Sequence, residues 1–148
     1  MTIAQTATTS FKVELPQGIH NFGPTSPDTF KVALYTAAAN LDGSTAVYTT
    51  SGEVVGAGYT AGGNTLVINV TPVAANNSAN VPTAYFSFSN TSWTSATFTA
   101  RGALIYNSTE GNKSVAVLDF GADKTVSNDT FQIIFPTADA NSAIVRIS

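Results

Sequence analysis

Few side chains in this sequence have the types and spacing that chemistry requires. His20 is the one histidine, and the chain has no cysteine. A zinc site needs several converging ligands, so His20 alone does not predict one. A serine hydrolase of the common type carries a Gly-x-Ser-x-Gly turn at its nucleophile, and no such turn occurs. We therefore expect His20 to be structural or to face solvent.

The nine acidic residues are scattered along the chain. The stretch DFGAD comes nearest to a calcium loop, but Asp119 and Asp123 supply only two carboxylates, and calcium takes several oxygen ligands. Two carboxylates could also meet in space, as they do in glycoside hydrolases, but nothing in the sequence favours such a pair. The sequence therefore predicts no enzyme activity, no metal ion and no other cofactor.

The glycine-rich stretch GAGYTAGG, residues 56–63, invites comparison with a phosphate-binding loop. Its glycine spacing differs from the dinucleotide fingerprint, and the TLVINV that follows alternates as a strand does. Phosphate binding of this kind depends on the N-terminus of a helix after the loop. The stretch is therefore predicted to be a glycine-rich hairpin turn.

Arg101 stands at the point where the alternation of TFTAR stops and apolar residues begin. Gly102 follows it, which is typical of a β-bulge. The stretches ALIY and VAVLDF are separated by a short turn and are expected to form a hairpin. If Tyr106 faces Ser114 in this hairpin, Arg101 lies directly opposite Asp119 and pairs with it.

The elements that carry these residues are mostly short β-strands. Only 10% of residues are charged, and glycine or proline separates stretches in which apolar side chains alternate. About eight or nine such strands can be counted, with almost no amphipathic helix. The sequence predicts an all-β protein, either an antiparallel β-sandwich or a jelly-roll-like barrel. The expected strands are TFKVALYT, TAVYTT, EVVGAGYT, TLVINV, TAYFSFS, ATFTARGALIY, SVAVLDFG, TFQIIFP and SAIVRIS.

Residues 1–28 differ in pattern from the rest and are predicted to form an N-terminal arm before a β-sandwich domain, residues 29–148. Within the arm, SFKVEL is expected to form a short helix with Ser10 as its N-cap, ended by Pro16. Residues 72–82 contain two prolines and show no periodicity, so a long loop is expected there.

Three stretches, ALIY, SVAVLDF and QIIF, are apolar on both faces. Strands of this kind need a covering layer on each side of their sheet. The candidates for the additional layer are the arm and another subunit, and either of them favours a structural protein that assembles. The residues predicted for an interface are Phe11, Leu15, Ile19, Phe22, Trp93, Arg101 and Asp119.

The charge pattern argues against nucleic-acid and membrane partners. The formal net charge is −3, and the six lysines and arginines do not cluster. No apolar run approaches the roughly 20 residues of a membrane helix. The first ten residues lack the basic and apolar regions of a secretory signal. We expect a soluble protein that is made in a cytoplasm.

Three stretches resemble a family of small virion proteins of tailed bacteriophages. They are TSFKVELPQGIHNF, DTFKVALYTAAANLDGSTAVYTTSGEVVGAGYTAGG and TARGALIYNSTEGNKSVAVLDFGADKTVSNDTFQIIFP. The resemblance implies a capsid decoration, or cement, protein without catalytic residues. Such proteins bind the outside of an expanded icosahedral shell and tie neighbouring capsomers together, often as trimers. It therefore implies a homotrimer on the capsid surface, with the major capsid protein of the same phage as partner, made in the host bacterial cytoplasm.

Two other kinds of function remain open. A carbohydrate- or receptor-binding β-module of a phage tail or adhesin would gather Trp93, Tyr48 and Tyr59 on one concave surface, although Trp93 is expected more readily in a core or an interface. A tail-tube or head-to-tail connector component would form rings or tubes when purified. An enzyme is the least favoured, since no nucleophile–base pair or set of metal ligands is recognisable.

Overall fold

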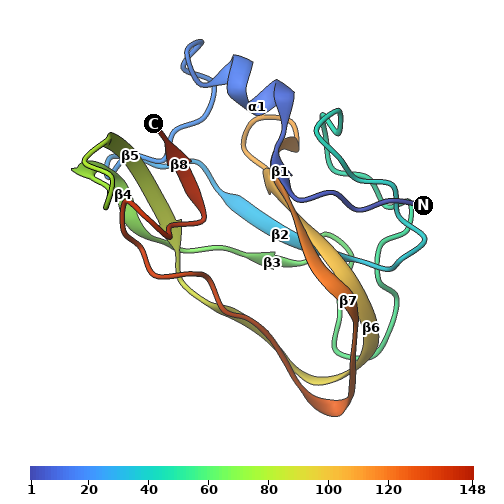
Figure 1. The fold of residues 1–148 in the computed structure, drawn as a ribbon. Helices are drawn as coiled ribbons and strands as arrows, with labels where there is room; N and C mark the ends of the chain where they lie inside the picture. The colour runs from blue at the N-terminus through green and yellow to red at the C-terminus, as the bar shows by residue number, and fades with distance from the viewer.

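A computed structural model describes residues 1–148 and shows an almost entirely β protein (Figure 1). The strands are β1 (Thr6–Ala7), β2 (Phe30–Tyr35), β3 (Asn64–Thr65), β4 (Ile68–Asn76), β5 (Pro82–Phe88), β6 (Thr91–Asn107), β7 (Lys113–Ile133) and β8 (Val145–Ile147). They form a five-stranded sheet of order β1-β7-β6-β2-β3 and a three-stranded sheet of order β4-β5-β8. All neighbouring strands are antiparallel, so the all-β sandwich expected from the sequence is confirmed.

One helix, α1 (Thr9–Glu14), lies in the arm. Its N-cap is Thr8, whose side-chain oxygen accepts the N–H of Phe11. The sequence predicts Ser10 as the N-cap, and the observed cap lies two residues earlier. The Thr8 hydroxyl occupies the position that satisfies a free N–H of the first turn. No helix of the structure has the length and apolar character that a membrane span requires.

The arm packs on its own sheets and covers one face of the five-stranded sheet. Phe11 and Phe22 are only 1% and 4% exposed, in the larger of two hydrophobic cores. The ring of Phe22 stacks on Phe30 of β2 at a centroid distance of 4.2 Å and lies 4.0 Å from Phe86 of β5. The arm therefore shares the core between the two sheets with β5 and β8, and Phe11 and Phe22 do not form the separate third layer that the sequence predicts.

The opposite face of the five-stranded sheet is covered by residues 36–63, here called the covering segment. A second, smaller core lies between them, made of Ala33, Tyr35, Ala39, Leu41, Leu104, Tyr106 and Val117. Ile3 of the arm packs against this core and forms a parallel bridge with Leu41. Both faces of ALIY and SVAVLDF are therefore covered within one chain, whereas Ile134 of QIIF is 70% exposed.

The prediction of two strands within the covering segment, TAVYTT and EVVGAGYT, is wrong. These residues make only isolated bridges, such as the one between Tyr35 and Glu53. In the second stretch, Gly58 adopts a positive φ value and interrupts the extended backbone, and Gly52 does the same just before it. The first stretch makes a single bridge, from Val47 to Lys113.

The hairpin of β6 and β7 links the two sheets, since the ends of these strands curve away from the five-stranded sheet (Figure 1). The sequence predicts two strands, SVAVLDFG and TFQIIFP, where the structure has the single strand β7. Its pairing with β6 is irregular at several points, and Ser95 and Asn128 adopt positive φ values. Bulges of this kind bend and twist a strand without ending it.

The register of this hairpin differs by one residue from the predicted register. Tyr106 has the expected partner, but Val115 is an extra residue on β7, so Asp119 lies opposite Gly102 instead of Arg101. A second irregularity brackets Arg101, where the sequence predicts a bulge. The extra residue also turns Val115 towards the larger core, away from the face on which its alternation places it.

The prediction of a long loop at residues 72–82 is also wrong, since β4 and β5 form a hairpin there. Residues 73–76 pair with residues 82–85, which leaves a short turn. Asn77 accepts two backbone N–H groups of this turn through its side chain, and Asn80 adopts a φ of 59°. Asparagine thus supplies the turn chemistry that glycine more often provides.

Candidate functional site

His20 lies at the centre of a polar cluster that joins the arm to the sheet. Its Nε2 donates to a Glu14 oxygen of α1 at 2.6 Å, and its Nδ1 accepts from Asn107 Nδ2 at the end of β6 at 3.0 Å. Lys113 of β7 donates to the other Glu14 oxygen at 3.2 Å. The His20 side chain is completely buried, and Lys113, which is 38% exposed, lies at the outer side of the cluster.

The orientation of the Asn107 amide fixes the tautomer of His20. The Asn107 oxygen accepts the backbone N–H groups of Thr109 and Glu110, and its nitrogen donates to Asp28. The amide nitrogen therefore faces His20 as a donor, and Nδ1 of His20 carries no proton. Because both ring nitrogens are engaged, neither is free to take a proton from a nucleophile. The sequence predicts that His20 is either structural or exposed to solvent, and the observed role is the structural one.

A second polar cluster is built around Glu53 in the covering segment, and no local sequence pattern indicates it. One Glu53 oxygen accepts the hydroxyl of Tyr48 at 2.7 Å. The other accepts the hydroxyl of Tyr59 at 2.6 Å and the N–H of Gly62 at 2.7 Å. Tyr106 of β6 donates its hydroxyl to the carbonyl of Gly62 at 2.7 Å. The cluster thereby fixes the glycine-rich turn on the sheet.

The tyrosines of this region are hydrogen-bond donors that stay protonated at neutral pH. Burial, and then the hydrogen bond to Glu53, raises the pKa of Tyr48 and of Tyr59 well above the usual 10.0. Burial, and then the charge of Glu53, raises the pKa of Tyr106 to about 12. The same two causes raise the pKa of Tyr35. None of these hydroxyls is activated as a phenolate nucleophile.

In the glycine-rich stretch 56–63, the N–H groups of Tyr59, Gly62 and Gly63 are engaged by acceptors of the protein. At Gly63, φ is 72° and a Cβ atom would lie 1.8 Å from the carbonyl oxygen of Val32. Glycine is thus required by the close approach of this turn to β2. The stretch forms an irregular turn of the covering segment instead of the predicted hairpin turn between two strands.

Arg101 and Asp119 form the ion pair that the sequence predicts. Arg101 Nε lies 3.4 Å from an Asp119 oxygen, and the two side chains are 35% and 28% exposed. The pair forms despite the register difference because the arginine side chain is long. A hydrogen bond from the N–H of Gly121, and then the contact with Arg101, lowers the pKa of Asp119. This carboxylate is therefore occupied by donors of the protein.

The aromatic residues proposed for sugar stacking do not form an exposed platform. Trp93 is 4% exposed and packs against Tyr59 and Phe131 at ring distances of 6.1 and 6.0 Å. Its indole N–H has no hydrogen-bond acceptor in the protein. The hydroxyl groups of Tyr48 and Tyr59 are both directed at Glu53, within the protein. The feature that would favour the carbohydrate-binding alternative is therefore missing from these residues.

The residues predicted for an interface occupy three different environments. Phe11, Phe22 and Trp93 lie in the larger core of this chain. Leu15 and Ile19 are half-buried on the arm. Arg101 and Asp119 form a half-exposed pair with each other, so only part of the predicted set presents surface to a partner.

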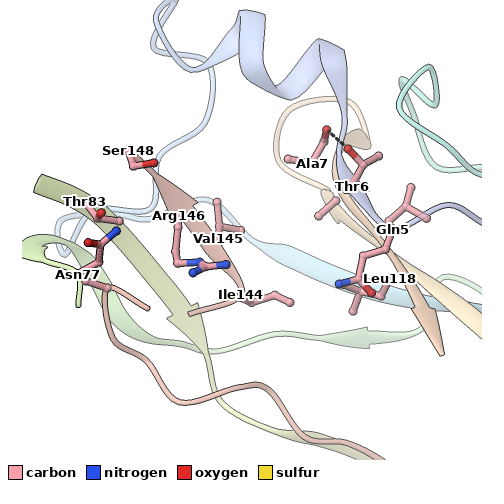
Figure 2. A pocket seen from close by; sticks show the side chains of 13 residues that line it. Gln5, Thr6, Ala7, Asn77, Thr83, Leu118, Ile144, Val145, Arg146 and Ser148 are labelled. Carbon is pink, nitrogen blue, oxygen red and sulfur yellow. Dashed lines mark hydrogen bonds between the residues drawn. The ribbon is translucent and has the colours of Figure 1, made fainter. Parts of the chain in front are cut away.

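A cleft of about 450 Å³ lies between the two sheets (Figure 2). β1, the edge of the five-stranded sheet, flanks it on one side, and β8, the edge of the three-stranded sheet, flanks it on the other. Of its 13 lining residues, Arg146 is the one with a charged side chain. An edge strand presents backbone N–H and C=O groups that have no strand partner on one side. The cleft is therefore the candidate site for docking.

The polar groups of the molecule thus fall into two sets. The His20 and Glu53 clusters are engaged within the protein, whereas two of the four sheet edges, β1 and β8, flank the cleft. Comparison with known proteins adds no relative, since no family model, no curated protein and no solved structure matches this chain.

Proposed function

We propose that this protein is a non-enzymatic decoration, or cement, protein of a bacteriophage capsid, which binds the outside of the shell and ties neighbouring capsomers together. The observation that carries the proposal is that the clustered polar side chains are engaged within the protein, whereas strand edges beside the cleft have no strand partner. The clustered titratable side chains hold the arm and the covering segment in place, and two strand edges without a strand partner, β1 and β8, lie beside the cleft. Such a surface suits binding of another polypeptide. The sequence resemblance to virion proteins supports the same role.

The proposed partner is the major capsid protein of the same phage, met on the capsid surface after synthesis in the host cytoplasm. β1 and β8 are two and three residues long, so each edge offers few hydrogen bonds to a partner. Binding through such edges gains affinity when several contacts form together on a repeating shell. A homotrimer would present three clefts, and this oligomeric state is inferred from the resemblance alone.

Two alternatives have less support. A carbohydrate- or receptor-binding module of a tail or adhesin would use exposed aromatic rings, whereas Trp93 is buried and Tyr48 and Tyr59 are directed at Glu53. A tail or connector component would assemble with itself into rings or tubes, and electron microscopy of the purified protein would reveal them.

Cryo-electron microscopy of capsids mixed with the purified protein tests the proposal. Capsids that lack the protein should gain density at regular points of the outer lattice. Capsids that already carry it serve as the control and should gain none. If the capsids that lack it stay bare at protein concentrations far above those used for assembly, the decoration role is refuted.

A further inference from the structure

We propose that the cleft between β1 and β8 receives an extended, acidic segment of a partner polypeptide, with the partner's backbone along the strand edges and its carboxylate on Arg146. The inference rests on the proposed function, in which this segment belongs to a subunit of the capsid shell. It adds the chemistry of the partner, which the decoration role alone does not specify.

The strand edges supply the backbone part of the recognition. β1 is hydrogen-bonded to β7 on one side, and β8 is bonded to β5 on one side. Each strand therefore keeps one free edge, and the cleft runs between the two strands. Addition of an extended segment to a sheet edge forms main-chain hydrogen bonds, and the pockets beside the edge select its side chains. A segment in this cleft can contact both sheets at once.

Arg146 supplies the charge selection. It makes no ion pair, whereas Arg101 and Lys113 each have a carboxylate partner. Its side chain has one hydrogen bond within the protein, to the carbonyl of Asn141. A guanidinium group has five N–H donors, so most of its donors remain available. Figure 2 shows Arg146 on the β8 side of the cleft, across from Gln5 on the other side.

The remaining lining favours small, apolar or hydroxyl-bearing side chains on the bound segment. Besides alanines at 7, 116 and 140, it has the larger apolar residues Leu118, Ile144 and Val145, and Gln5, Asn77 and Thr83 provide uncharged polar groups. No carboxylate side chain of the protein lies in the lining to compete for Arg146. An acidic segment with small neighbours therefore fits the cleft better than a basic or a bulky aromatic one.

Synthetic peptides provide the probe for this chemistry. One short peptide alternates alanine and threonine around a central glutamate, and two matched peptides carry glutamine or lysine in its place. We expect the glutamate peptide to shift the backbone amide NMR signals of β1 and β8 in the full-length protein. Replacing glutamate by glutamine should weaken binding about tenfold, the effect of one lost charge-assisted pair. The lysine peptide should bind more weakly still.

Charge reversal at Arg146 tests the assignment against non-specific binding. Arg146→Glu should invert the order of the three peptides, so that the lysine peptide binds best. Lys12→Glu is the matched control, since Lys12 is exposed on α1 and does not line the cleft, and it should leave the order unchanged. Because Arg146 is exposed, the spectrum away from the cleft should show that the variant is folded.

The outcomes separate this inference from the proposed function. An unchanged peptide order in Arg146→Glu, or shifts confined to other strands, overturns the cleft assignment whether or not capsids are decorated. The expected inversion, together with capsids that stay bare, refutes the decoration role and leaves the cleft as a site for acidic segments.

Discussion

Replacing Phe22 by alanine should destabilise the whole protein, because this arm residue belongs to the core between the two sheets. Its ring lies 4.2 Å from that of Phe30 and 4.0 Å from that of Phe86, and it is 4% exposed. Deleting a buried phenylalanine ring costs about 3–5 kcal/mol of unfolding free energy. Each aromatic contact contributes roughly 0.5–1.5 kcal/mol beyond area burial, so the upper part of that range is expected. A loss near 4 kcal/mol is a large part of the roughly 5–15 kcal/mol that holds a domain folded.

Urea unfolding followed by Trp93 fluorescence and by circular dichroism measures this loss. With a denaturant slope of about 1–3 kcal/mol per molar urea, a 4 kcal/mol loss lowers the midpoint by more than about 1 M. Val13→Ala is the control, since Val13 lies on the same arm with 56% of its surface exposed. That change should stay within about 0.5 kcal/mol. A Phe22→Ala effect below about 1 kcal/mol, or a separate early transition confined to the arm, would show that residues 1–28 fold apart from residues 29–148.

Three further predictions concern the polar clusters. Glu53→Gln should lower the unfolding free energy by about 1–3 kcal/mol, because an amide cannot accept hydrogen bonds at both terminal atoms. Glu110→Gln is the control, since no hydrogen bond to its carboxylate is present, and equal effects would contradict this role of Glu53. Because the folded state raises the pKa of the buried tyrosines above 10.0, their contribution to stability should persist below pH 10 and be lost as the pH rises towards about 12, where Tyr106 titrates. The absorbance change of these four tyrosines should therefore be displaced above pH 10, and their ionisation at pH 10 in a protein that is still folded would refute the assignment. In a double-mutant cycle, Arg101→Ala and Asp119→Ala should be non-additive near neutral pH. Strict additivity near neutral pH would show that the pair is not coupled. Since the pKa of Asp119 is lowered in the folded state, the stability that its carboxylate contributes should be lost as the pH falls below 3.8 through the folded pKa.

The strands with regular alternation could be predicted from the sequence because strand periodicity is a local property. Phe30, Val32 and Leu34 share one face of β2, and the structure places all three in the larger core. β5 and β6 fall where alternation predicts them, and the Arg101–Asp119 contact could be predicted from the hairpin. The pair survives the one-residue register difference because a long side chain tolerates it.

The covering segment could not be predicted, because it has no periodicity to reveal it. Its contribution to the second core comes from isolated residues, such as Ala39 and Leu41, separated by turns. The His20 cluster is hidden for another reason, since His20 and Asn107 are 87 positions apart and only the sheet topology brings them together. The bulge at Val115 depends on how two strands twist together, which neither strand encodes alone.

Covering both faces of a sheet within one chain also determines where a partner strand can bind. The five-stranded sheet, whose faces are covered, has β1 and β3 as its edges, and the three-stranded sheet has β4 and β8. β4 contains Pro72, which cannot donate to a neighbouring strand, and its pairing with β5 is irregular at two points. Natural proteins use such features to prevent edge-to-edge association. β1 and β8 contain no proline and instead flank the cleft, so a partner strand reaches them only by entering between the sheets. In the proposed arrangement, the protected β4 edge limits unspecific pairing, and the single charge of Arg146 selects the segment that binds.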